Sequence, residues 1–193
     1  MISTLATAGL WALTCFLSAP PAISAAEKIR LEAGEVIIHP RTPADDDGFA
    51  VRAYALVDAP VDRIWPALRD CGRYSEFMPR VKASDVRGGT PENGICFVEI
   101  AMPFPFSNLW AENKSEGGPL AGGAFERRWT LSKGTYRKNK GLWGVAPWAG
   151  GPKSLVYYEL EASPDTAVPD AILRKAQTGA LPDAFEAVRE RVK

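Results

Sequence analysis

Two ionisable side chains in apolar surroundings, Arg127 and Glu99, are the residues best suited to acid–base or anion chemistry. A strand over "AFERRWTLS" places Arg127 and Trp129 on one face. If this face points into a cavity, the guanidinium binds a ligand oxygen; if it points outward, the side chain lies at the rim. Glu99 alternates with Phe97 and is either a general base or a solvent-facing strand residue. Both are weak catalytic candidates, and the alternatives stay open.

Histidine chemistry has almost no support in this sequence. His39 is the single histidine, and it lies in a polar segment near the N-terminus. A nucleophile–histidine pair therefore lacks its base, and a zinc site lacks its cluster of Cys and His ligands. We expect no metal and no cofactor.

The charge balance argues against nucleic acid as a partner. The 193 residues include 23 basic and 23 acidic side chains, for a formal net charge of zero, whereas binding to phosphates needs an excess of Lys and Arg. One local group of basic residues is either a solvated turn or a docking patch for a lipid head group or an acidic partner. It comprises Lys133, Arg137, Lys138 and Lys140.

The stretch "MPFPFSNLW", residues 102–110, is too apolar for an ordinary surface loop and too rich in proline for a central strand. Its large side chains either line or lid a ligand pocket or plug one end of a dry core. We favour the pocket wall, formed by Met102, Phe104, Phe106 and Trp110.

Residues 1–26 are predicted to be an export signal. An apolar run over residues 5–17 precedes Glu27, the first charged side chain. The small residues Ser24 and Ala26 suit cleavage near Ala26. A periplasmic or secreted protein follows from this interpretation.

A retained membrane anchor is the alternative, because the first four residues carry no Lys or Arg. Pro20 and Pro21 argue against it, since a membrane span needs about 20 uninterrupted apolar residues. We expect a polar lead-in over residues 27–48 and one domain over residues 49–193.

Two cysteines remain after the predicted cleavage. In an exported protein, Cys71 and Cys96 are candidates for a disulfide. The alternative is a pair of buried free thiols, and the sequence does not choose between them.

The pattern of apolar residues predicts an α+β domain. Alternation over residues 49–57 indicates a strand, and residues 61–70 and 72–78 form two short helices. Strand-like runs broken by Gly and Pro fill residues 81–164, as in an antiparallel meander. Residues 169–192 carry an apolar stripe at steps of three and four, typical of one long helix. A curved antiparallel sheet wrapped around that helix is the expected architecture.

The stretch "VDAPVDRIWPALRDCGRYSEFMPRV" resembles the opening of START-like, helix-grip proteins. It is similar in particular to the polyketide cyclase and coenzyme-Q-binding branch, where an Ala-Pro turn, a helical Trp and an Asp-x-x-x-Tyr-x-x-Phe-x-Pro pattern follow one another. The resemblance covers residues 50–193. It implies a cavity for an apolar ligand between the sheet and the long helix. The predicted ligand-binding residues are Trp65, Tyr74, Phe77, Met102, Phe104, Phe106, Trp110, Arg127, Trp129, Trp143, Leu173 and Leu181.

We therefore expect an exported carrier or chaperone of a lipid or isoprenoid quinone, with transient membrane contact, rather than an enzyme. A polyketide cyclase or dehydratase acting on an aromatic precursor in the same cavity is the alternative. A third hypothesis is an interaction module without a ligand, which predicts a collapsed interior and an exposed apolar patch around Trp143 and Trp148.

Overall fold

The computed structural model describes residues 20–43, 45–149, 151–166, 168 and 170–193. The apolar run over residues 5–17 lies outside them. The helices and strands are α1 (Ala25–Glu32), β1 (Ile37–Arg41), β2 (Phe49–Val57), α2 (Val61–Arg69), the 3₁₀ helix η1 (Cys71–Glu76), β3 (Val81–Gly89), β4 (Gly94–Ile100), β5 (Leu109–Pro119), the 3₁₀ helix η2 (Ala121–Gly123), β6 (Phe125–Gly134), β7 (Tyr136–Pro147), β8 (Ser154–Pro164) and α3 (Asp170–Arg191).

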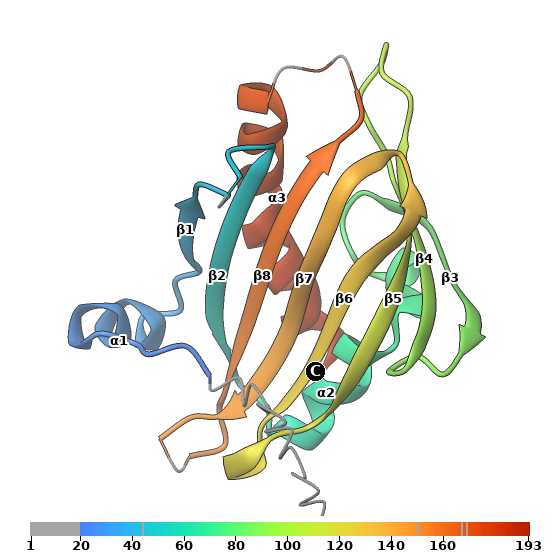
Figure 1. Cartoon of the computed structure of the whole chain (residues 1–193). Helices are drawn as coiled ribbons and strands as arrows, with labels where there is room; N and C mark the ends of the chain where they lie inside the picture. The colour runs from blue at the N-terminus through green and yellow to red at the C-terminus, as the bar shows by residue number, and fades with distance from the viewer. Residues whose placement is uncertain (1–19, 44, 150, 167, 169) are drawn as a thin grey trace, which may run out of the picture.

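The described strands form one antiparallel sheet in the order β1-β2-β8-β7-β6-β5-β4-β3. Figure 1 shows the sheet curving around α3, which runs diagonally across one face, with α2 near the lower end of the same face. This arrangement confirms the expected α+β, helix-grip architecture. Its chain order follows from the meander from β3 to β8, because consecutive hairpins keep neighbouring strands adjacent.

Two short helices follow β2, as the sequence predicts. Pro66 lies inside α2, where it removes one backbone hydrogen bond, and the helix ends three residues later. The second helix is a 3₁₀ helix, η1, whose Tyr74 is buried and donates its hydroxyl proton to the carbonyl of Leu68. Together α2 and η1 cover the end of the sheet face that α3 leaves open.

The N-terminal segment contributes to the sheet. β1 pairs with β2 as an edge strand, with Ile37 opposite Tyr54. Before it, α1 begins at Ser24, whose side chain forms a capping box with Glu27. No helix was predicted here: the polar lead-in was expected to contain at most a short strand over residues 35–39, which β1 overlaps, so α1 is a correction. Leu31 of α1 is buried on the outer sheet face.

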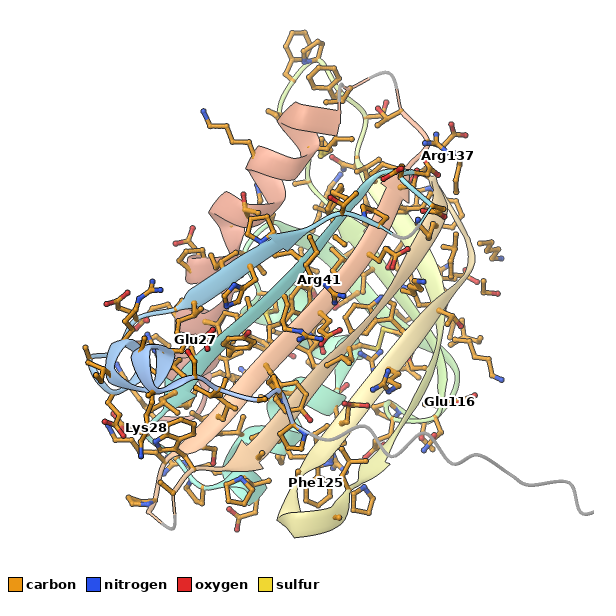
Figure 2. All side chains as sticks on the ribbon, turned by 60° about the vertical axis from the view of Figure 1, so that its left-hand side comes forward. Glu27, Lys28, Arg41, Glu116, Phe125 and Arg137 are labelled. Carbon is orange, nitrogen blue, oxygen red and sulfur yellow. A yellow bond between two sulfur atoms is a disulfide. The ribbon has the colours of Figure 1, made fainter. Side chains whose placement is uncertain are left out.

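Figure 2 shows this outer face, with Arg41 of β1 lying over the sheet in front of β2 and β8. The guanidinium of Arg41 is 3.9 Å from the carboxylate of Glu159 on β8. At one end of the same face, Arg137 pairs with Asp47 at 2.8 Å. Ion pairs therefore lie on the outer face beside the apolar cluster that α1 helps to cover.

The main hydrophobic core lies between the sheet and the helices α2, η1 and α3. Phe185 of α3 is fully buried, and its ring meets that of Trp143 edge-on at 5.6 Å. No helix within the described residues is both long and apolar enough to cross a membrane. Trp143 is 5% exposed, so the exposed patch that an interaction module would present around this residue is not found.

Candidate functional site

The sheet face covered by α3 encloses a cavity of about 210 Å³. Its lining side chains come from β2, from η1 and the segment after it, from β3 to β8, and from α3. Most of them are apolar or aromatic. No Asp, Glu or His occurs among the lining residues that the structure describes. The collapsed interior that the interaction-module hypothesis predicts is therefore absent.

More than half of the predicted ligand-binding residues line this cavity. They belong to η1, β6, β7, α3 and the loop before β5, and they are Tyr74, Met102, Arg127, Trp129, Trp143, Leu173 and Leu181. They lie far apart in the sequence, and the closing of α3 over the sheet brings them together. Binding of a ligand by these side chains stays a prediction.

The aromatic loop before β5 does not form the predicted wall. The side chain of Phe104 is 97% exposed and that of Phe106 is 39% exposed. Trp110 is on the outer face of β5, where its ring lies 6.1 Å from that of Phe97. The reason is alternation along β5, because Leu109 and Ala111 point into the cavity and the residue between them must point away. Of this group, Met102 alone lines the cavity.

Two further predicted residues are in the core beside the cavity instead of lining it. Trp65 of α2 is 7% exposed, and its ring lies 5.2 Å from that of Phe125. Phe77 is partly buried against this core, packs edge-on with Tyr74, and has the guanidinium of Arg191 over its ring. Both side chains hold helices against the sheet.

The weak catalytic candidate Glu99 points away from the cavity. Its neighbours on β4, Val98 and Ile100, are the lining residues, so alternation places the carboxylate outside. There it accepts a hydrogen bond from the amide of Asn108 at 2.6 Å and lies 3.5 Å from the ammonium of Lys82. The Asn108 hydrogen bond, aided by Lys82, lowers the pKa of Glu99. The solvent-facing interpretation therefore holds, and Glu99 is not a base for a ligand in the cavity.

Arg127, by contrast, points inward and is 2% exposed. Its Nη2 donates to the hydroxyl of Ser115 at 2.7 Å, and its Nε donates to the carbonyl of Pro91 at 3.2 Å. Asn113, on the same face of β5 as Ser115, also lines the cavity, and its Oδ1 has no hydrogen-bond partner. These polar groups form one patch in an otherwise apolar cavity.

Sequence reasoning missed Asn113 and the tyrosines Tyr136 and Tyr158, all of which line the cavity. The inward alternation of Leu109, Ala111 and Asn113 was the available signal. Burial raises the pKa of Tyr136 and of Tyr158. Their hydroxyls therefore stay protonated at neutral pH and act as hydrogen-bond donors or acceptors, not as bases.

Cys71 and Cys96 form a disulfide, which was one of the two alternatives that the sequence left open. Cys96 lines the cavity on β4. The bond joins η1 to the sheet and so holds this part of the cavity wall in place.

The basic group around the β6–β7 hairpin is engaged in ion pairs. Lys133 pairs with Glu112 at 3.3 Å, and Lys140 pairs with Glu161 at 3.2 Å. The other two members also have acidic partners: Arg137 pairs with Asp47 and Asp165, and Lys138 pairs with Asp45 and Glu161. Their charges are locally balanced, which favours the solvated turn over a docking patch.

Known proteins share this sequence pattern and geometry. Residues 57–189 match the family described as polyketide cyclase / dehydrase and lipid transport. The structure is similar to a STAR-related lipid transfer protein from Xanthomonas axonopodis, with a TM-score of 0.71 and 20% identity over 81% of this chain and 93% of that one. For the human StAR-related lipid transfer protein 5 the TM-score is 0.72, at 10% identity over 82% of each chain. No curated protein matches the sequence.

A START superfamily protein from Mycobacterium smegmatis is a third similar structure, with a TM-score of 0.58 and 16% identity over 74% of this chain and 96% of that one. At these identities the solved structures establish the fold, and the family match spans more than half of the chain. The predicted START-like resemblance is thereby confirmed. The chain belongs to the polyketide cyclase / dehydrase and lipid transport family, whose fold supports the binding of a hydrophobic small molecule in this cavity.

Proposed function

We propose that the protein is an exported carrier or chaperone that holds a lipid or an isoprenoid quinone in the cavity under α3. The observation that carries this proposal is the lining: it is mainly apolar and, within the described residues, contains no Asp, Glu or His. Such a surface binds an apolar guest but lacks a general base for chemistry on it.

The cost of an empty cavity supports an occupant. At about 24 cal/mol per Å³, a dry void of 210 Å³ destabilises the fold by about 5 kcal/mol. The total stability of a domain is about 5–15 kcal/mol. A bound apolar molecule removes much of this cost, so ligand binding and folding stability are coupled.

The disulfide supports export. Disulfides form and persist in oxidising compartments such as the periplasm or the extracellular space, and Cys71 and Cys96 are joined in the core. The predicted signal over residues 1–26 has the same implication.

The loop over residues 101–108 supports transient membrane contact. Phe104 is exposed at its tip, while Met102 in the same loop lines the cavity. A large apolar side chain that is almost fully exposed gains free energy by entering an apolar phase. Contact through this loop places the cavity next to the membrane from which a lipid would come.

The direct test is to extract the purified protein and identify bound molecules by mass spectrometry, then to titrate delipidated protein with fluorescent lipid and quinone analogues. We expect a bound apolar molecule and saturable 1:1 binding. Ala111→Phe fills the cavity and should abolish binding, whereas Lys114→Phe adds the same side chain to the outer face of β5 and should not. A protein that is empty and ignores all probes contradicts the proposal.

A cyclase or dehydratase acting on an aromatic precursor is the second candidate. The favouring observation is that Arg127 and the hydroxyl-bearing rings of Tyr136 and Tyr158 line one cavity. Together they could polarise a ketone oxygen. Turnover of aromatic polyketide precursors by the purified protein would support this activity over simple carriage.

A further inference from the structure

Arg127 is a buried positive charge without a negative partner in the described part of the chain. Its side chain is 2% exposed. Among the described residues its hydrogen bonds go to a serine hydroxyl and a backbone carbonyl, and no carboxylate lies within ion-pair distance. A charge removed from water in this way is stabilised when an anion lies beside it.

Arg127 lines the cavity, and the two hydrogen bonds use two of its five guanidinium N–H groups. Nε is used by Pro91 and one proton of Nη2 by Ser115. Nη1 and the second proton of Nη2 form the end of the fork. Of the described residues, Tyr74 also interacts with the guanidinium through its hydroxyl oxygen. Two parallel N–H groups in this arrangement match the two oxygens of a carboxylate.

Asn113 provides a second, independent indication of a polar ligand group. It is 7% exposed, lines the cavity, and its Oδ1 has no partner. Two residues further along the same face of β5, Ser115 holds Arg127. The amide presents a donor in place of the oxygen when it turns by half a rotation, so it can bind an oxygen of the same group that Arg127 holds.

The patch lies at the end of the cavity away from the exposed loop. Leu109, at the start of β5, follows that loop, and Ser115 is six residues further along the strand. At about 3.3 Å per residue, this separation is roughly 20 Å. Apolar lining, including Trp129 and Leu181, fills the space between the two ends. An amphiphile therefore fits with its polar head at Arg127 and its tail toward the loop.

We propose that this patch binds the carboxylate of a single-chain amphiphile, such as a fatty acid, which enters head first. The inference rests on the proposed function and specifies its ligand class. One buried cation matches one negative charge, since the other lining cation, Arg80, is exposed. A quinone or a neutral lipid would leave the guanidinium without an anion.

The test titrates delipidated protein with decanoate, decanol and methyl decanoate, which share one tail length and differ in the head group. We expect wild-type protein to bind decanoate at least about tenfold more tightly than the two neutral ligands. Arg127→Met should bring the three affinities within about twofold of one another. Lys114→Met removes an exposed positive charge from the outer face of β5 and should keep the preference.

Asn113→Asp is a second variant, which places a carboxylate of the protein near Arg127. It should weaken decanoate binding and leave decanol binding within about twofold. If Arg127→Met does not fold, Asn113→Asp and the three titrations of wild-type protein still test whether the patch binds a carboxylate. Equal binding of all three ligands by wild-type protein would overturn the head-group site while leaving the carrier function intact. Binding of none of the three would also overturn the head-group site, and the titration with lipid and quinone analogues described above would then decide the carrier function.

Discussion

Cys71 in η1 is bonded through its sulfur to Cys96 on β4, and Cys96 lies directly opposite Asn113 on β5. The disulfide thus connects the short helical segment to β4, the neighbour of the strand β5 that carries Asn113 and Ser115 of the polar patch. Both cysteines are buried, at 0% and 3% exposure. The bond therefore stabilises the fold and fixes part of the cavity wall at the same time.

Replacing both cysteines by alanine should lower the free energy of unfolding by about 3–4 kcal/mol. The reason is the loss of a cross-link closing a loop with a sequence separation of 25 residues. Urea denaturation of the oxidised wild type and of the double variant measures the difference. As a control, a reducing agent should destabilise the wild type and leave the variant unchanged. A wild type that is indifferent to reduction would contradict the prediction.

Gly144→Ala should destabilise the protein by about 1–3 kcal/mol, because an added Cβ would overlap the ring of Tyr157. Gly144 and Tyr157 are paired across β7 and β8, and Tyr157 is 2% exposed. Its ring cannot move into solvent without disturbing the apolar cluster on the outer face of the sheet, which includes Leu142 and Leu155. Gly118→Ala on β5 is the matched control, since a Cβ there meets open space. Thermal unfolding of the two variants should separate them by several degrees.

Much of the fold was predictable because its elements carry strong local patterns. The alternation in β2 and the three- and four-residue spacing in α3 require no knowledge of tertiary contacts. The helix α1 was missed because its short sequence has only one buried side chain, Leu31. Its start signals are the capping-box residues Ser24 and Glu27, but Ser24 was assigned to a cleavage site and Glu27 to the lead-in.

The site was less predictable than the fold. Alternating side chains show that a strand has two faces, but they do not show which face points into the cavity. The pattern around Arg127 and that around Glu99 were equivalent in the sequence. Sheet curvature and the position of α3 place the first inside and the second outside. For Phe104, apolar character was taken as a sign of burial, yet its loop leaves the ring exposed.

The attachment of α1 to β1 should weaken in acid. In the uncleaved chain, which keeps Ser24, hydrogen bonds from Ser24, together with His39 at 2.8 Å, lower the pKa of Glu27 from 4.5 to about 2. Because the folded pKa lies below the unfolded one, the stabilisation is complete above pH 4.5 and is lost as the pH falls toward 2. Hydrogen-exchange protection of the α1 amides, measured between pH 6 and about 2.5, should fall within this window.

Glu27→Gln should remove this pH dependence, since the amide cannot ionise. Glu32→Gln is the control in the same helix: Glu32 makes only a 3.9 Å ion pair with Lys28, and half of its side chain is exposed. Glu32→Gln should therefore still lose the hydrogen-exchange protection of α1 in acid, as the wild type does. If Glu27→Gln loses α1 protection over the same pH range as the wild type, another group causes the transition.

Phe104→Ser should weaken binding to lipid vesicles without changing stability. The side chain is 97% exposed, so its removal costs no core packing. Burying a Phe side chain is worth about 1.5–3 kcal/mol, so vesicle affinity should fall about tenfold or more. Co-sedimentation with vesicles and the rate of ligand transfer between vesicles measure the effect. Ile29→Ser, which removes a 69% exposed side chain from α1, is the matched control and should leave both unchanged. An equal loss of vesicle affinity in both variants would indicate nonspecific adsorption of apolar side chains. No loss in Phe104→Ser would exclude this residue from the membrane contact.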